Sequence, residues 1–117
     1  MIKTRSLKGR GLFKLVLKKG KYESGKYITI YIFRTKKEFS ENNFLGICVS
    51  KKHGNSVIRN KIKRWAKETY TAIEKDIDSG YNIIILYKKN IEIKDLSYDV
   101  LQGEIKTLLI KIGIVHE

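Results

Sequence analysis

Residues 53–68, HGNSVIRNKIKRWAKE, have the pattern of an amphipathic helix with a strongly cationic outer side. Asn55 or Ser56 can cap its start, and the sequence DSG, which ends at Gly80, follows its last turn. We therefore predict a helix from residue 56 to about residue 75. At about 100° per residue its core-facing arc comprises Ile58, Ile62, Trp65, Ala66, Thr69, Ala72 and Ile73.

The opposite side of this helix carries almost only positive charge. Arg59, Lys63 and Lys67 repeat at a spacing of four residues, so like charges are stacked along one line. On a merely solvated helix face, residues four apart usually carry opposite charges, and each such pair stabilises the helix by about 0.2–0.5 kcal/mol. We therefore favour a face that binds an anionic partner over a face that is merely solvated.

Upstream, two strands are predicted. In KYITIYIFR, residues 26–34, the isoleucines point one way, whereas Tyr27, Thr29, Tyr31 and Phe33 point the other way. FLGICVSK, residues 44–51, also alternates, and the polar residues between the two segments favour a hairpin-like connection that places the strands side by side. The aliphatic faces then form the core.

The aromatic face has two interpretations. The rings either pack under a neighbouring helix or form a platform for unpaired nucleotides. Lys14, Lys18 and Lys19 on the predicted neighbouring helix favour the second, because a basic rim around aromatic rings is how single strands are held.

Three further elements complete the predicted order. Residues 11–20 form a short helix, and residues 81–88, YNIIILYK, form a strand that is apolar on both faces and so internal. The last helix is capped by Ser97 and stopped by Gly113, with an apolar stripe between them. The order α-β-β-α-β-α predicts an α+β fold, a two-layer α/β sandwich with helices against one sheet.

Composition limits the possible classes. A chain of 117 residues with 42% apolar residues fits a single domain, residues 1–117. Cys48 is the one cysteine, so no internal disulfide forms, and a reducing cytoplasm is expected. The longest apolar run, IIIL, is too short to span a bilayer, and the start lacks the apolar segment of a signal peptide.

Charge is distributed unevenly. Residues 1–67 hold 19 Lys and Arg against 3 acids, a net +16, and residues 68–117 hold 6 against 9, a net −3, which together give +13. Such a polarised molecule attracts nucleic acid, an anionic membrane or an acidic protein. A membrane would require exposed apolar bulk behind the basic helix, and here that bulk faces the core.

Catalytic groups are scarce. The basic half has almost no carboxylates for metal-assisted chemistry, and Asp95 and Asp99 are explained by capping. Only two histidines accompany the single cysteine, so we expect no metal site. His53 is interpreted as a loop residue rather than a catalytic base. Open alternatives are a general or ribosomal nucleic-acid-binding module and a protein-only nuclease.

Residues 49–68, VSKKHGNSVIRNKIKRWAKE, resemble the signature of the bacterial ribonuclease P protein component, S-K-K-x-G-N-A-V-x-R-N-R-x-K-R. The order of predicted elements is similar over essentially the whole chain. The resemblance implies an RNA-binding subunit with a left-handed βαβ crossover. It also implies a catalytic RNA that cuts the 5′ leader from precursor tRNA, with Mg²⁺ bound mainly by the RNA, and no obligate protein partner or membrane.

The resemblance also implies two sets of site residues. The set facing the catalytic RNA is Lys51, Lys52, Gly54, Asn55, Arg59, Asn60, Lys61, Lys63, Arg64 and Lys67. The set in a leader-binding cleft between the first helix and the sheet is Phe13, Leu17, Tyr31, Cys48 and Ser50. Lys14 and Lys18, which form a basic rim beside the aromatic strand, are added to this set. Leu17 stands where the family often has an aromatic ring, and Lys61 and Lys67 where it often has arginine, so weaker stacking and single-point phosphate contacts are expected.

Overall fold

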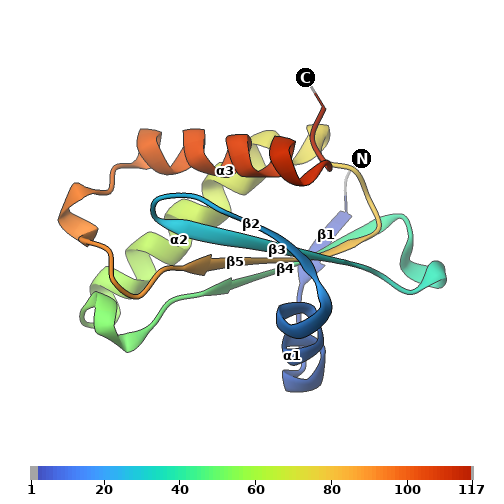
Figure 1. The fold of residues 1–117 in the computed structure, drawn as a ribbon, viewed down its shortest axis with the longest axis horizontal. Helices are drawn as coiled ribbons and strands as arrows, with labels where there is room; N and C mark the ends of the chain where they lie inside the picture. Colours follow the sequence, from blue (N-terminus) through green and yellow to red (C-terminus); the bar gives the residue numbers. More distant parts are fainter. Residues whose placement is uncertain (1–2, 117) are drawn as a thin grey trace.

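The computed structural model describes residues 3–116 and contains one five-stranded sheet with three helices (Figure 1). Short 3-10 turns connect several of the main elements. In chain order the main elements are β1 (Lys3–Ser6), α1 (Arg10–Lys19), β2 (Lys21–Ser24), β3 (Ile28–Arg34), β4 (Asn42–Cys48), α2 (Ser56–Ile73), β5 (Tyr81–Tyr87) and α3 (Tyr98–Ile112).

The sheet has the order β1-β4-β5-β3-β2, so β5 is its central strand. It runs parallel to β4 and antiparallel to β3, and Ile83, Ile84 and Ile85 are fully buried. The prediction that this segment is internal is confirmed. The prediction that β3 and β4 lie side by side is wrong, because β5 is inserted between them and the polar connection with its 3-10 turn (Lys37–Phe39) is no hairpin.

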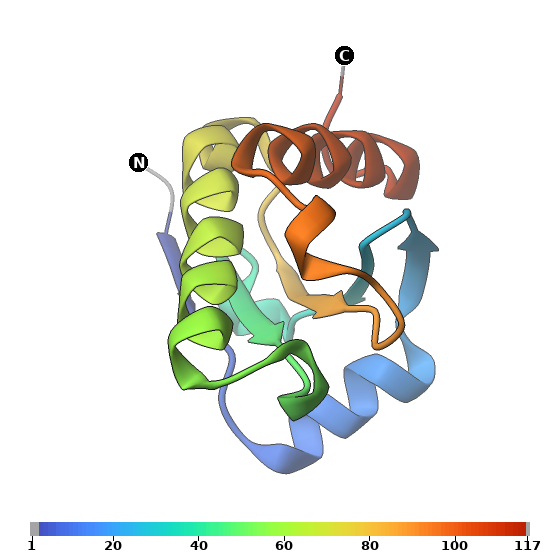
Figure 2. The ribbon, with the colours of Figure 1, turned by 90° about the vertical axis from the view of Figure 1, so that its left-hand side faces the viewer.

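Helices cover the two faces of the sheet unequally. Both α2 and α3 pack on one face, and α1 alone lies on the other, at the opposite end of the molecule in Figure 2. The α+β class is confirmed, with α1 adding a partial third layer to the predicted two. The β4–α2–β5 segment is a parallel βαβ unit, and its left hand, which the resemblance implies, stays a prediction.

The predicted helix boundaries hold closely. Asn55 caps α2 by accepting a hydrogen bond from the Ile58 amide (3.0 Å), and Ser97 caps α3 through the Val100 amide (3.1 Å). Gly113 ends α3 in the left-handed conformation, with φ of 97°. The end of α2 falls at Ile73, two residues before the predicted one.

The buried side of α2 is rotated from the predicted arc. Ile62, Ala66 and Thr69 are buried as expected, but Tyr70 is buried too, and Ala72 and Ile58 are exposed. Tyr70 belongs to the main core cluster, and its hydroxyl hydrogen-bonds the Thr4 hydroxyl of β1 (3.0 Å).

Two edge strands, β1 and β2, are absent from the predicted order. Each has four residues and no alternation of apolar and polar side chains, so periodicity gives no signal for them. Tyr27 also departs from its predicted aromatic face. It precedes β3, lies in the core beneath α3, and donates a hydrogen bond to the Asp95 carbonyl (3.2 Å).

Glu104 fastens α3 to the turn between β2 and β3. Its carboxylate accepts hydrogen bonds from the backbone amides of Lys26 (2.8 Å), Tyr27 (2.9 Å) and Ile28 (2.8 Å). Charge-assisted bonds of this kind are stronger than neutral ones. Glu104 of α3, on the face of the sheet opposite α1, therefore holds the turn that places β2 beside β3.

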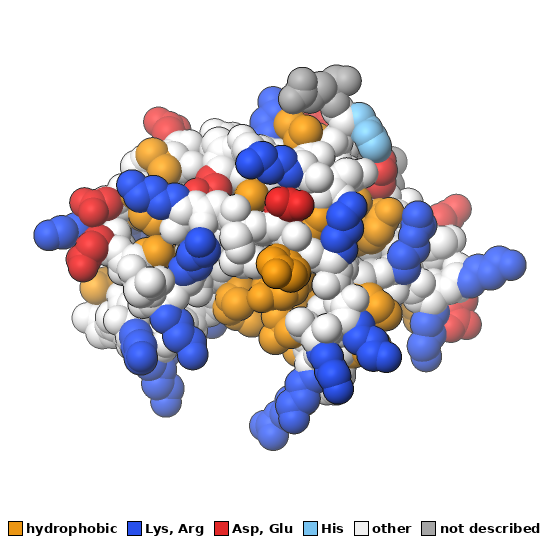
Figure 3. Space-filling model, in the orientation of Figure 1, with side chains coloured by type: hydrophobic (Ala, Val, Ile, Leu, Met, Phe, Trp, Pro, Cys, Tyr) orange, Lys and Arg blue, Asp and Glu red, His pale blue; other side chains and the backbone are white. Residues whose placement is uncertain are grey.

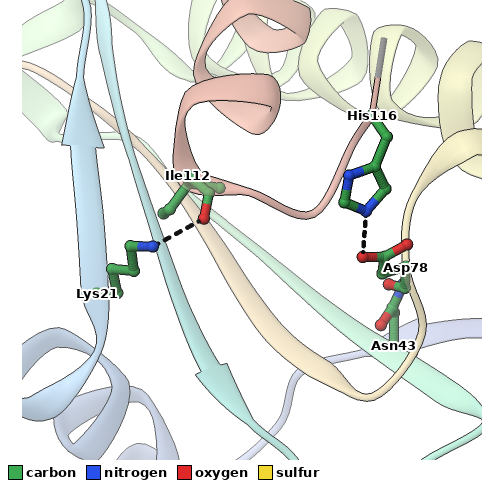
Figure 4. A network of polar contacts seen from close by, with 5 residues as sticks. All are labelled: Lys21, Asn43, Asp78, Ile112 and His116. Atoms are coloured by element: carbon green, nitrogen blue, oxygen red, sulfur yellow. Dashed lines mark hydrogen bonds and ion pairs between the residues drawn. The ribbon is translucent and has the colours of Figure 1, made fainter.

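The end of α3 is joined to the strands as well (Figure 4). Lys21 of β2 donates to the Ile112 carbonyl (3.1 Å), and His116 contacts the Asp78 carboxylate (2.8 Å). The buried Asn43 side chain donates to the Asp78 carbonyl (3.0 Å) and accepts from the Tyr81 amide (2.9 Å). These bonds fix the loop that leads into the central strand.

Candidate nucleic-acid interface

A basic ridge runs along the outer side of α2. Lys61, Lys63, Arg64 and Lys67 are exposed, and Arg59 is half-buried. Lys51 and Lys52 extend the ridge beyond the start of the helix, on the 3-10 turn Lys51–His53. The remaining predicted members, Gly54, Asn55 and Asn60, are exposed at the same end of α2.

Little of this charge is neutralised within the described residues. The one ion pair on the ridge joins Arg64 to Glu68 at 3.7 Å, and both side chains are largely exposed. Such a pair contributes about 0–1 kcal/mol and leaves the guanidinium free to exchange partners. The Lys61 ammonium lies 4.9 Å from the centre of the Trp65 ring, and the Arg59 Nε is buried without a partner among residues 3–116. The ridge thus stays cationic.

The turn before α2 is held by its own hydrogen bonds. The Ser50 hydroxyl accepts from the Lys52 amide (3.2 Å), and Gly54 adopts a φ of 128°, which a side chain would rarely tolerate. The His53 ring is buried, and its Nε2 donates to the Lys88 carbonyl (2.6 Å). His53 therefore lies in a loop as predicted, where it anchors the turn to the end of β5.

A groove of about 420 Å³ lies between α2 and the β1–β4 edge. Lys63, Arg64 and Lys67 line it on the helix side, and Arg5 lines it on the strand side. Sequence reasoning missed Arg5, because the strand that places it there has no detectable periodicity. The ridge is consequently wider than one helix face.

On the α1 face of the sheet, the strand register brings most of the predicted cleft together. Tyr31 of β3 is aligned with Ile84 of β5, which is aligned with Gly46 of β4. The Phe13 ring of α1 packs directly over Gly46, where a Cβ would collide with it. Phe13, Tyr31 and Cys48 belong to one cluster and are each half-buried, so the rings are not sealed inside the protein.

The other predicted cleft residues lie at its margins. Leu17 is 39% exposed on α1, and Ser50 follows β4 at the point where the sheet meets the basic ridge. Lys14 and Lys18 are exposed and stand about 200° around α1 from the fully buried Val16. They therefore lie on the outer side of α1, pointing away from the sheet and from the predicted cleft residues.

Tyr22 lies beside the predicted cleft residues, although the sequence did not point to it. It pairs across β2 and β3 with Tyr31, their ring centres are 5.6 Å apart, and its side chain is 61% exposed. Figure 3 shows hydrophobic surface beside α1 with Lys and Arg side chains on both sides. An isolated tyrosine between charged residues gives no sequence signal, and only the register of the edge strand places it.

The Ribonuclease P family model matches residues 1–113. The chain belongs to the ribonuclease P protein family. The ribonuclease P protein component of Clostridioides difficile is 35% identical over 108 residues, covering 92% of this chain and 90% of that protein. That of Bacillus cereus strain G9842 is 36% identical over 89 residues, 76% of each chain.

Solved structures agree with this assignment. The Staphylococcus aureus RNase P protein superposes with a TM-score of 0.81 at 29% identity, covering 95% of this chain and 97% of that one. The Thermotoga maritima RNase P protein gives a TM-score of 0.79 at 26% identity over 92% and 96% of the chains. The resemblance seen in the sequence is thereby confirmed, and the chain is a protein subunit of the ribonuclease P holoenzyme, a ribonucleoprotein of tRNA processing.

In this ribonuclease P protein, Cys48 is the last residue of β4 and lies between the predicted cleft residues and the basic ridge. Burial raises the pKa of its thiol, and the nearby Lys63 ammonium acts in the opposite direction. The thiol is thus mainly protonated near neutral pH and serves as a small apolar contact. Within residues 3–116, no cluster of three His, Cys, Asp or Glu could hold a metal ion, and no helix is long and apolar enough to cross a membrane.

Proposed function

We propose that this protein grips two parts of the ribonuclease P assembly at once. The basic ridge binds the catalytic RNA, and the cleft beside α1 binds the single-stranded 5′ leader of precursor tRNA. The RNA subunit performs the hydrolysis with Mg²⁺ that it binds itself. The protein has no catalytic group in this scheme and acts by raising precursor affinity and by neutralising RNA phosphates.

The observation that supports this proposal is the separation of the two surfaces. The ridge lies on the outer side of α2, and the half-buried rings lie on the α1 face of the sheet. Ser50 and Cys48, at the end of β4, connect them. An RNA strand that leaves the cleft along this strand end meets Lys51 and Lys52 next, so both surfaces can be occupied together.

The composition of each surface fits its proposed partner. A folded RNA presents phosphates at regular spacing, which a row of lysine and arginine side chains matches. An unpaired leader presents the flat faces of its bases, which stack on rings such as Tyr31 and Tyr22 and contribute about 1–3 kcal/mol per base. A general RNA-binding module would lack any preference for a leader. A protein-only nuclease would need a cluster of acidic residues, whereas Glu68 on the ridge is paired with Arg64.

Processing assays test the proposal. Cleavage of precursor tRNA by the catalytic RNA is measured with and without the protein, at low and at physiological Mg²⁺. We expect the protein to tighten precursor binding and to lower the Mg²⁺ requirement. The same precursor affinity and the same Mg²⁺ requirement with and without the protein would reject the mechanism. Cleavage by RNA-free protein would instead establish the nuclease alternative.

Two substitutions test the division of labour. Tyr31→Ala should weaken binding of the precursor more than binding of mature tRNA, because only the precursor has a leader. Arg64→Ala should mainly weaken assembly with the catalytic RNA. The same defect in both variants would show that the two surfaces do not act separately.

A further inference from the structure

A second hollow lies on the flank of α1 away from the leader-binding cleft. It has a volume of about 330 Å³ and opens between the start of α1 and the connection of β3 to β4. Its apolar walls are Leu12, Phe39 and Phe44. Figure 3 shows hydrophobic surface on both sides of the projecting α1 helix.

The sheet register places this hollow in a row beside the proposed cleft, and Leu12 and Phe44 pack in the same apolar cluster as Phe13 and Tyr31. Asn82 of β5 is aligned with Phe33 on one side and Phe44 on the other, two residues along the strands from the row that holds Tyr31 and Gly46. On α1, Leu12 and Phe13 are about 100° apart around the helix. Phe13 covers Gly46 in the cleft cluster, whereas Leu12 lines the second hollow.

Asn82 is the feature that points to a ligand. Its side chain is 5% exposed and contributes to the lining of the hollow, on the same face as Phe44. Within residues 3–116, no side-chain hydrogen bond of Asn82 is found, and its carboxamide is not among the fully enclosed unpaired groups, so it keeps a small contact with solvent. An amide offers both a donor and an acceptor, the pair of groups that a nucleobase edge presents in return.

The walls suit a flat ring. The Phe39 and Phe44 rings meet edge to face, with centres 5.8 Å apart and planes at 85°. Phe39 is 39% exposed, so part of its ring is accessible to a ligand. The volume lies near the lower end of the range for ligand pockets, about 300–1,000 Å³, which suits one nucleotide better than a folded RNA element.

The charged side chains found on the rim among the described residues are all positive. Arg5 and Lys36 border the hollow, and an adjoining hollow of about 370 Å³ shares Arg5, Leu12 and Phe44 and adds Lys8. Among residues 3–116, no acidic side chain lines either one. A phosphate attached to a ring in the first hollow would therefore lie among cations.

From these observations we infer that the hollow holds one unpaired nucleotide of RNA. The base stacks on Phe39, its edge pairs with the Asn82 carboxamide, and its phosphate lies between Arg5 and Lys36. This inference rests on the proposed function as an RNA-binding subunit, to which it adds a nucleotide site independent of the leader cleft.

Titration of the isolated protein with nucleoside monophosphates, followed by NMR, tests this site. We expect the side-chain NH₂ signals of Asn82 to shift with each nucleotide that binds, and inorganic phosphate alone to leave them in place. The backbone signals of Tyr31 and Cys48 report on the cleft in the same spectra. If the signals of Tyr31 and Cys48 shift and those of Asn82 do not, the inference is overturned and the proposed function stands. If only the Asn82 signals shift, the result counts against the leader-binding cleft.

Variants sharpen the test. Phe39→Ala should raise the dissociation constant read at Asn82 at least about fivefold, since a stacked base contributes about 1–3 kcal/mol. Phe39 is partly exposed, so this variant should remain folded. Val100→Ala, an exposed substitution on α3, should change nothing. Equal affinities in Phe39→Ala and Val100→Ala would overturn the stacking assignment.

A photo-crosslink identifies the RNA that supplies the nucleotide. Phe39→p-benzoylphenylalanine is incorporated into the protein, which is then assembled with the catalytic RNA and precursor tRNA. We expect one crosslinked nucleotide, in an unpaired segment of one of the two RNAs, and sequencing shows which. Crosslinks that are absent, or scattered over paired regions, would contradict the inference.

Discussion

Tyr22→Ala probes the leader-binding cleft with little risk to the fold. The Tyr22 ring is 61% exposed, so its removal gives up little buried surface and should change the free energy of unfolding by no more than about 0.5 kcal/mol. Its ring touches Tyr31 and extends the aromatic surface outwards. If one leader base stacks there, the variant loses about 1 kcal/mol or more, which corresponds to at least about a fivefold weaker affinity for precursor tRNA.

The assay is equilibrium binding of precursor and mature tRNA to the reconstituted holoenzyme. Only the precursor should respond, because mature tRNA has no leader. Tyr22→Phe keeps the ring and should bind like the unaltered protein, and Tyr98→Ala, on α3 across the sheet, serves as an aromatic control. The reasoning is refuted if both tRNAs weaken equally, or if Tyr22→Phe is as defective as Tyr22→Ala.

Four other predictions follow from single contacts. Glu104→Ala removes the acceptor of three backbone amides and should lower the free energy of unfolding by about 2–3 kcal/mol, measured by urea denaturation. Gly46→Ala places a methyl group against the α1 ring above it and should cost about 1–3 kcal/mol in the same experiment, and an unchanged midpoint would show that α1 shifts freely. Replacing Lys63 and Lys67 together by alanine should make the slope of log binding constant against log salt concentration less steep by roughly 2 for the catalytic RNA. An unchanged slope would mean that neither lysine contacts a phosphate. Because burial raises the pKa of the Cys48 thiol, iodoacetamide should modify it more slowly at pH 8 than it modifies a free cysteine, and an equal rate would contradict the assigned environment.

Much of the helical structure could be predicted from the sequence because its signals are local. Caps at Asn55 and Ser97, a stop at Gly113 and a 3.6-residue period define α2 and α3 within two residues. The central strand was recognisable because it is apolar on both faces. Each of these features depends on interactions within one element, and a single segment is enough to reveal them.

Strand order could not be predicted in the same way. The aliphatic faces of β3 and β4 give no information on whether a third strand separates them, since β5 presents the same kind of face to both. The two edge strands are short and polar, and their described side chains are mostly exposed, so burial imposes no alternation on them. Only the register of those strands shows that Tyr22 lies beside Tyr31 and that Arg5 lies beside Phe44.

The proposed leader-binding cleft and the second hollow both lie on the α1 face of the sheet. One short helix covers only part of that face. A seven-residue strand is about 23 Å long, and five strands span about 19 Å from the first to the last. The 18-residue α2 and the 15-residue α3 together cover one face of that sheet. On the other face stands the 10-residue α1, about 15 Å long and about 10 Å wide.

A helix of that size leaves uncovered sheet on both of its flanks. Its close approach fixes where those flanks lie, because Gly46 admits the Phe13 ring and a Cβ at Gly20 would collide with the Ile32 backbone. Aromatic and aliphatic side chains of the sheet therefore end half-buried on each side of α1. The cleft and the second hollow share this one cause, so a lengthened α1 or a second helix on this face would close both.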